Sequence, residues 1–124
     1  MRVVHEPAEG DGTRTLASDV EVAEGLWAKF RGLRFRRSIP EHYALVFEFS
    51  HPGRRDIDML FVRTPLDVLW LEDERVRQVK TLRPWIGFGL ARADCVIELP
   101  PDAADGVEAG DRVVVVEGED DSTG

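Results

Sequence analysis

Four arginines lie within seven residues in the segment RGLRFRRS, residues 31–38. If this segment is extended, successive side chains point to opposite faces, so Arg34 and Arg36 share one face while Leu33 and Phe35 share the other. Two guanidinium groups on one face can bind a carboxylate or a phosphate through paired hydrogen bonds. The alternative is pairing within the molecule, because the chain also carries 24 acidic side chains. The pattern therefore leaves open an anion site and a set of internal ion pairs.

Two aspartates in apolar surroundings form a second candidate group. Asp58 lies in the segment DIDMLFV at 56–62, and Asp67 follows soon after Pro65. Two carboxylates held close together can act as a general acid and a general base. Alternatively, Asp67 braces the turn after Pro65, or either aspartate pairs with Arg36, since a buried charge needs such a partner. We therefore favour a non-enzymatic binding module and keep an enzyme that uses the two aspartates as an alternative.

Exposed-looking aromatic residues lie in the loop-like segment PWIGFGLAR, residues 84–92. Trp85 and Phe88 can border a ligand pocket or form a contact surface for another protein, or this loop can fold onto the end of the domain as a plug. A third interpretation is a structural protein that docks through residues 84–90. In the favoured interpretation the ligand is a small anion or a peptide terminus, and the predicted ligand-binding residues are Arg34, Arg36, Asp58, Asp67, Trp85 and Phe88.

The other residues that could do chemistry predict no metal site and no cofactor. His5, His42 and His51 do not fall at the spacings typical of metal ligands. The single cysteine, Cys95, cannot form an internal disulfide and is typical of a small buried apolar residue. No glycine-rich phosphate loop precedes a helix. We expect no catalytic residue among these groups.

Charge and composition limit the partners. The formal net charge is −8, and non-specific nucleic-acid binding needs a basic face, so we expect no nucleic-acid partner. An acidic, lysine-poor chain is typical of a salt-loving organism, which makes a halophilic archaeal source a hypothesis; a genome rich in G and C would also replace lysine by arginine. We expect no signal peptide, and the chain shows no run of about 18 apolar residues that could span a membrane. We expect a cytoplasmic protein without membrane contact; its oligomeric state is open, with a monomer favoured.

The elements that must position these residues are mostly short strands. We expect one domain over residues 1–118 and a disordered acidic tail over 119–124. Val22, Leu26 and Phe30 recur at helical spacing, which predicts a helix over 18–33 that ends near Gly32. A short helical turn is expected within 101–111. Strands are expected at 2–5, 13–17, 43–49, 56–62, 66–73, 75–82, 94–100 and 112–118, with a turn at 50–53.

These elements indicate an α+β fold that is mostly β. We expect a small, curled or barrel-like sheet, mixed or antiparallel, with one main helix and one short helical turn. Strands never alternate regularly with helices along the chain, which argues against a doubly wound parallel sheet.

Five segments, in order along the chain, resemble motifs of one family. The segment RGLRFR at 31–36 is similar to its GLMFR signature, and ALVFEF at 44–49 is similar to its GMLFVF strand. The remaining three resemble its T-x-x-PLD-I, YVLELPAG and GI-x-x-GD-x-V motifs: TPLDV at 64–68, CVIELP at 95–100 and VEAGDRV at 107–113. This family is DUF192 (domain of unknown function 192), small proteins of bacteria and archaea. The resemblance covers roughly residues 15–117 and suggests an archaeal-type variant.

The resemblance implies a compact β-rich domain with a helix, and it implies little about activity because the family has no settled one. The arginine of the GLMFR signature matches Arg36, which favours that side chain as a ligand contact. Bacterial members have an aromatic-Trp-Met-Lys-Asn-Thr run before their Pro-Leu-Asp motif, whereas this chain has IDMLFV at 57–62. Any role of that Lys-Asn pair is therefore not carried over to this chain.

Overall fold

A computed structural model describes residues 1–10, 12–25, 32–34, 36 and 38–117 of the chain. The described residues form eight strands and no helix. The strands are β1 (Arg2–Glu6), β2 (Arg14–Ala17), β3 (Asp19–Ala23), β4 (Tyr43–Asp58), β5 (Leu66–Glu72), β6 (Arg75–Leu82), β7 (Phe88–Leu99) and β8 (Arg112–Val116). The fold is therefore nearly all β.

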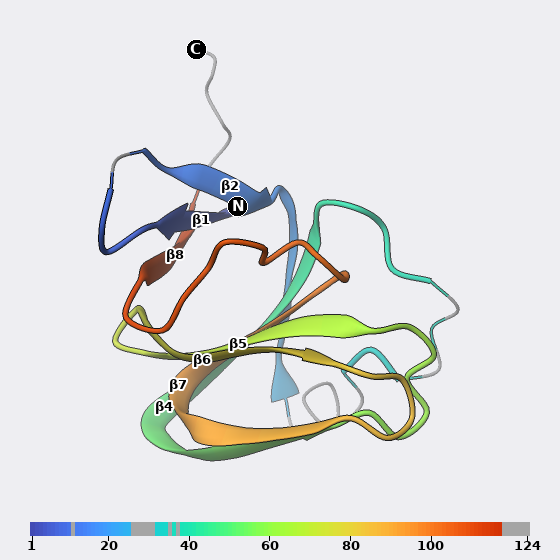
Figure 1. The fold of residues 1–124 in the computed structure, drawn as a ribbon. Coiled ribbons are helices and arrows are strands. Elements are labelled where there is room, and N and C mark those ends of the chain that lie inside the picture. The colour runs from blue at the N-terminus through green and yellow to red at the C-terminus, as the bar shows by residue number, and fades with distance from the viewer. Residues whose placement is uncertain (11, 26–31, 35, 37, 118–124) are drawn as a thin grey trace.

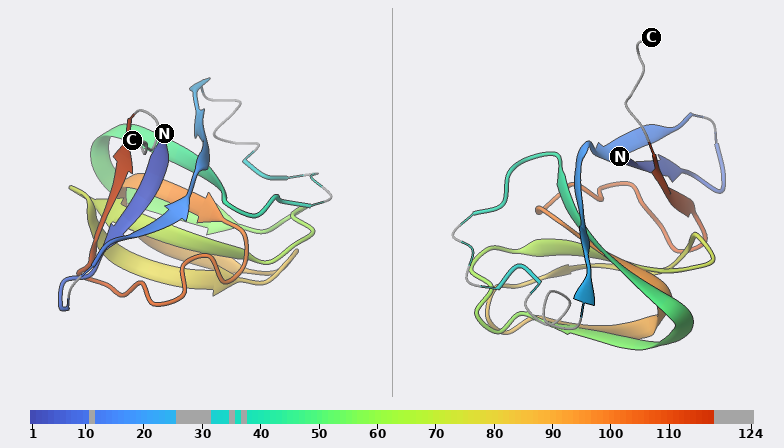
Figure 2. Two further views of the ribbon diagram at one scale, coloured as in Figure 1. Left: turned by 90° about the horizontal axis from the view of Figure 1, so that it is seen from above. Right: turned by 180° about the vertical axis from the view of Figure 1, so that it is seen from behind.

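One sheet contains all eight strands, in the order β2-β1-β8-β6-β5-β7-β4-β3 (Figure 1). Neighbouring strands are antiparallel except β3 and β4, which pair in parallel. The two edge strands, β2 and β3, are separated in sequence by Ser18 alone. The backbone N–H groups of Ser18 and Asp19 both donate to the His42 carbonyl oxygen at 2.9 Å. Because these two consecutive strands form opposite edges of the sheet, the sheet must curl until those edges approach, as both views in Figure 2 show.

Two apolar cores occupy the two faces of the curled sheet. The first lies inside the curl, because it joins strands from both ends of the sheet order, as Val3, Leu16, Val46 and Leu69 show. The second lies on the other face of β5 and β7 and includes Trp70. Burial on both faces explains why β5 is a nearly continuous apolar run, LDVLWLE.

The ends of β4 and β7 form an arm that folds over the second core. Their pairing is interrupted between Glu48 and Gly53 and then continues to the pair Asp58–Phe88. Trp70 Nε1 donates to the carbonyl oxygen of Arg55 at 2.8 Å, which holds the arm against β5. This arm carries Asp58 and Phe88 to one end of the molecule.

The predicted helix over 18–33 is wrong for its described residues. Asp19–Ala23 form strand β3 instead, with Val20 and Val22 half-buried and Asp19 and Glu21 exposed. β-Branched and acidic residues alternate with a period of two, which suits a half-buried strand. Parallel pairing with β4 favours this strand over the helix that the helical spacing predicted. The remaining positions of that spacing, Leu26 and Phe30, lie outside the described residues.

The short helical turn expected within 101–111 is also wrong. This connection is a series of tight turns, in which the N–H groups of residues 103, 105, 107 and 111 each donate to a carbonyl oxygen three residues earlier. Asp102, Gly106 and Gly110 have φ angles of 73°, 87° and 97°. Each of these left-handed residues interrupts a right-handed helix. The α+β class expected from sequence is therefore replaced by a nearly all-β fold.

Candidate functional site

A paired ion contact between Arg34 and Asp58 organises one end of the molecule. Arg34 Nη1 and Nη2 donate to the two carboxylate oxygens of Asp58 at 2.8 and 3.0 Å. These hydrogen bonds hold the pKa of Asp58 below its usual range and raise the pKa of Arg34. Arg34 Nη1 also donates to the carbonyl oxygen of Leu60 at 2.7 Å, and the Leu60 N–H donates to Asp58 at 3.0 Å. The ion pair therefore holds the beginning of the loop that follows β4.

The loop after β4 is hydrogen-bonded to the loop after β6. The Met59 N–H donates to the carbonyl oxygen of Gly87 at 3.0 Å, and the Trp85 N–H donates to that of Val62 at 3.2 Å. Phe61 and Trp85 have φ angles of 65° and 69°, a left-handed conformation that costs about 1 kcal/mol or more for such residues. Their rings meet edge to face, with centroids 5.4 Å apart. The two loops therefore form one structural unit.

Large apolar side chains on these loops and at the start of β7 are exposed to solvent. Ile86 is the most exposed of them at 72%, and Trp85 is 48% exposed. Large contiguous apolar patches are uncommon on soluble monomers and are typical of interaction surfaces. We call this group the exposed apolar cluster; its members are Leu60, Phe61, Trp85, Ile86 and Phe88.

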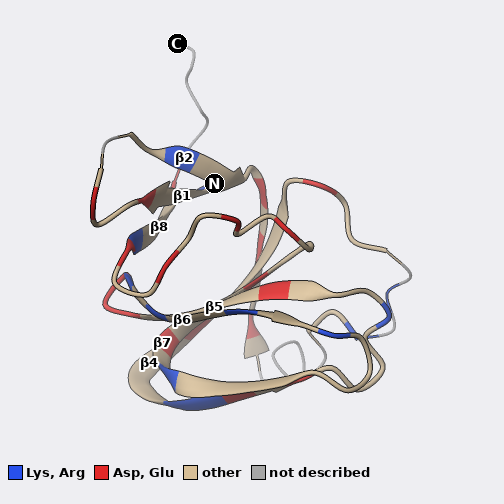
Figure 3. Ribbon diagram, in the orientation of Figure 1, with Lys and Arg blue, Asp and Glu red and all other residues tan. Residues whose placement is uncertain are grey.

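The charges around the exposed apolar cluster differ from those of the chain as a whole. Residues 59–65 and 83–88 contain the exposed Arg63 and Arg83 and no acidic residue. The connection 100–111, by contrast, contains four acidic residues and no basic one. Figure 3 shows red segments along this connection between β7 and β8, and blue segments near the loops at the right of the view. The two loops that carry the exposed apolar cluster are therefore basic, on a chain of net charge −8.

A buried glutamate lies beneath the Arg34–Asp58 pair. Glu98 is on β7 between Leu45 and Val68 of the neighbouring strands, and it is 5% exposed. Its Oε1 atom has no hydrogen-bond partner. Burial raises the pKa of Glu98 to about 7, although the positive charge of Arg34 opposes that rise. Glu98 can therefore gain or lose a proton near neutral pH.

The structure brings Arg34, Asp58 and Phe88 together and places Trp85 in the adjoining loop, because Asp58 pairs with Phe88 across β4 and β7. The other two predicted ligand-binding residues lie elsewhere.

Arg36 contacts neither aspartate. Its Nη2 atom lies 3.5 Å from Glu21 Oε1, and its guanidinium group lies 5.2 Å from the centre of the Tyr43 ring. The Tyr43 hydroxyl donates to the same glutamate oxygen at 2.5 Å, and burial raises the pKa of that hydroxyl.

Asp67 lies on the face of the inner core and is 3% exposed. Its two oxygens accept hydrogen bonds from the Thr81 hydroxyl at 2.8 Å and from the Ala104 N–H at 2.9 Å. It therefore braces the connection between β7 and β8, and no described contact joins it to Asp58.

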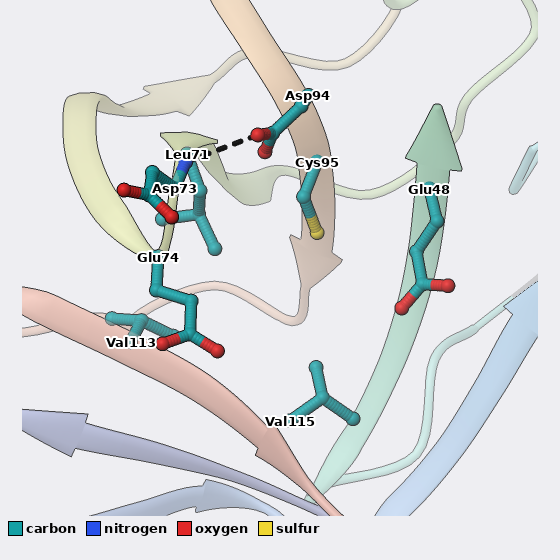
Figure 4. Close-up of a pocket in the computed structure, with 8 residues that line it drawn as sticks. All are labelled: Glu48, Leu71, Asp73, Glu74, Asp94, Cys95, Val113 and Val115. Atoms are coloured by element: carbon teal, nitrogen blue, oxygen red, sulfur yellow. Dashed lines mark hydrogen bonds between the residues drawn. The ribbon is translucent and has the colours of Figure 1, made fainter. Parts of the chain in front are cut away.

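An acidic cavity of about 390 Å³ lies on the inner-core face of β7, opposite the face that carries Glu98. In Figure 4 the Glu48 and Glu74 carboxylates and the Cys95 sulfur point into a common space. Glu74 already accepts a hydrogen bond from Arg112 at 2.8 Å. Burial, reinforced by nearby carboxylates, raises the pKa of the Cys95 thiol to about 12, so it is not a thiolate at neutral pH. Within the described part of the chain, no group of three or more His, Cys, Asp or Glu side chains could hold a metal ion.

Sequence reasoning missed Glu98, Leu60 and Phe61. The signal for Glu98 was present, since it is an acid between Ile97 and Leu99 in the strand expected at 94–100. Leu60 and Phe61 carried no such signal, because their segment was expected to be a strand over 56–62.

The comparisons with known proteins identify a family. The family model for DUF192, described as an uncharacterized ACR, matches residues 8–115. The chain belongs to the DUF192 family. The sequence of this DUF192 protein matches none of the curated proteins. None of these findings concerns the archaeal-type variant.

Two solved structures resemble this DUF192 protein over most of its length. One is a proposed transcription regulator from Sinorhizobium meliloti, with a TM-score of 0.77 and 24% identity over 91% of each chain. The other is a protein of unknown function from Novosphingobium aromaticivorans, with a TM-score of 0.73 and 21% identity over 92% of this chain and 84% of that one. At this level of identity the likeness shows the fold alone.

In the described part of the chain, no helix is long and apolar enough to cross a membrane. The expected cytoplasmic location, the halophilic source and the domain boundaries stay predictions.

Proposed function

We propose that this DUF192 protein is a non-enzymatic docking module that binds an acidic peptide segment with apolar side chains. The observation that carries this proposal is the exposed apolar cluster on two loops that contain Arg63 and Arg83 and no acidic residue. The apolar side chains offer contact area, and the arginines offer charge-assisted hydrogen bonds to carboxylates. On a chain of net charge −8, these two arginines give the loops a local positive charge that suits an acidic partner.

A peptide suits this end better than a small anion. Arg34 is engaged with Asp58, and Arg36 with Glu21, so a small anion has to compete with a carboxylate for either guanidinium group. A small anion would also leave the exposed Trp85 and Ile86 side chains without a contact.

The geometry does not support an enzyme built on the two aspartates. Asp58 is paired with Arg34, and both Asp67 oxygens accept hydrogen bonds within the fold. A shared proton between two carboxylates requires direct approach, and no described contact joins these two.

Fluorescence anisotropy with a labelled octapeptide of alternating aspartate and leucine or phenylalanine tests the proposal. We expect micromolar binding that weakens as salt is added. Replacing Trp85 by alanine should weaken binding by about 30-fold, the effect of losing a central aromatic contact. Replacing Arg63 or Arg83 should weaken it several-fold, whereas Arg77→Ala, an exposed arginine on β6, should leave it unchanged.

Other ligands of the exposed apolar cluster would give different results from the acidic peptide. Self-association that Trp85→Ala abolishes in sedimentation would make a second copy the occupant and overturn the proposal. Equal binding of a peptide with lysine in place of aspartate would overturn the role of the arginines. Binding of a DNA duplex in place of the acidic peptide would also contradict it, and would connect this chain with the description of the Sinorhizobium meliloti protein.

A further inference from the structure

Glu98 is a buried acid directly beneath the segment that carries Arg34. A Cβ atom built on Gly32 would lie 3.6 Å from Glu98 Oε1 and 3.6 Å from the Phe47 ring, so the backbone at Gly32 covers the carboxyl group. This Oε1 atom has no hydrogen-bond partner, and the residue is 5% exposed. A neutral carboxyl tolerates such a position at modest cost, but a carboxylate requires a partner.

The charged groups that face Glu98 come from few elements. Arg34, from the covering segment, and Asp58, from the end of β4, act on its charge in opposite directions. Along the row of paired residues on this face, Glu21 of β3 lies beyond Leu45, and Lys80 of β6 lies beyond Val68. In the described part of the chain, Arg34 is thus the cation placed to respond to Glu98.

In its present position, Arg34 is committed to one carboxylate and one carbonyl oxygen. Its Nη1 and Nη2 atoms are hydrogen-bonded to Asp58, and Nη1 also holds the carbonyl oxygen of Leu60. An ionised Glu98 competes for the same guanidinium group from a less exposed position, where an unpaired charge costs more. A turn of Arg34 toward Glu98 would break its hydrogen bond to Leu60.

We propose that Glu98 is a proton-operated switch for the loops after β4 and β6, which we call the docking loops. With a proton on Glu98, Arg34 holds Asp58 and Leu60 and keeps the exposed apolar cluster assembled. When the proton leaves, Arg34 turns toward Glu98 and releases the loop after β4. This inference deepens the proposed docking function and depends on it for its biological effect, but the loop movement itself requires no partner.

The pKa of Glu98, raised to about 7 by burial, supports the geometry because it puts the change in the neutral range. Two-dimensional NMR of the backbone amides of Leu60 and Trp85 tests the switch without any ligand. Both amides belong to the bonds that hold the loops together. Between pH 5.5 and 8.5 we expect both signals to shift with one common midpoint near 7.

Three variants separate this switch from other titrations. Glu98→Gln should keep both amide signals at their low-pH positions throughout. Arg34→Gln should keep them at their high-pH positions. Glu48→Gln, an exposed acid on the opposite face of the sheet, should retain the native transition. Native signals that stay fixed across this range, or a transition that persists in Glu98→Gln, would overturn the switch.

The octapeptide distinguishes failure of the switch from failure of the docking function. We expect its affinity for the native protein to fall about tenfold from pH 6 to pH 8, a typical coupling between two sites, and to stay constant for Glu98→Gln. An amide transition without peptide binding at any pH supports the switch and overturns the docking function. Peptide binding of equal strength at both pH values, with fixed amide signals, supports docking and overturns the switch.

Discussion

Two buried acids on neighbouring strands have opposite surroundings. Asp67 on β5 accepts hydrogen bonds at both oxygens, from a hydroxyl and from a backbone N–H, and thereby fixes a connection. Glu98 on β7 faces the other core, and its Oε1 has no partner. An acid whose hydrogen bonds are satisfied within the fold is structural, whereas an unsatisfied buried acid stores a cost that protonation relieves. Asp67, which the sequence predicted as a ligand-binding residue, is therefore structural, whereas Glu98, which it did not predict, can respond to pH.

Glu98 makes the stability of the protein depend on pH. Its pKa is raised from the ordinary 4.5 to about 7 in the folded chain, so the folded state binds more protons than the unfolded state between these values. The free energy of unfolding should therefore fall as pH rises from about 4.5 to 7, by about 3 kcal/mol, and the loss should be complete above 7.

Urea denaturation of the native protein and Glu98→Gln at pH 5 and pH 8 measures this contribution. The variant should be the more stable of the two at pH 8 and should lose less stability between the two pH values. A native protein whose loss of stability matches that of the variant would show that Glu98 does not carry the effect.

At the scale of elements, the arm formed by the ends of β4 and β7 positions the site. It projects from the sheet after an irregularity between Glu48 and Gly53, folds over Trp70 and ends at the pair Asp58–Phe88. The close approach depends on Gly89, where a Cβ atom would lie 2.4 Å from the Trp70 ring. The arm thus has a steric requirement for glycine at this position in the strand.

Replacing Gly89 by alanine should displace the arm and lower the free energy of unfolding by about 2 kcal/mol, the range expected for overpacking. It should also weaken octapeptide binding, because Phe88 and Asp58 move with the arm. Gly53→Ala is the matched control on the same arm, since a Cβ atom there would lie 3.5 Å from the end of the Arg55 side chain. Thermal melting of both variants checks this, and equal melting temperatures would argue against the steric requirement.

At the scale of the whole molecule, acidic charge is unevenly distributed over a curled sheet. The connection 100–111 is entirely acidic among its charged residues, whereas the docking loops are basic. The net charge of −8 generates repulsion within the compact state, which added salt screens.

The melting temperature should therefore rise by about 4 °C or more between low and molar potassium chloride, as the screening of repulsion stabilises the fold. Sorbitol at matched osmolality is the control for a general solute effect. A flat response to salt would contradict both the repulsion and the hypothesis of a salt-loving source.

Several strands could be predicted from sequence because their cause is local. The alternation in RVRQVKTL predicted a strand over 75–82, where β6 lies, and the apolar run over 66–73 contains β5. The segment 18–33 fitted both the helical spacing and the two-residue alternation of a strand. Only the pairing of β3 with β4 decided between them. The local sequence pattern was therefore enough to predict an element where it fitted only a strand or only a helix.

The sequence by itself determined the family, the β-rich character and the candidate residue types, because these follow from composition, alternation and short motifs. Only the tertiary structure decided which charges meet. Arg34 could pair with any of many acids, and the fold of the β4–β7 arm gave it Asp58. Strand register likewise turned Glu98 toward one core and Asp67 toward the other. Side-chain contacts between residues far apart in the chain depend on register and curl, which no local pattern specifies.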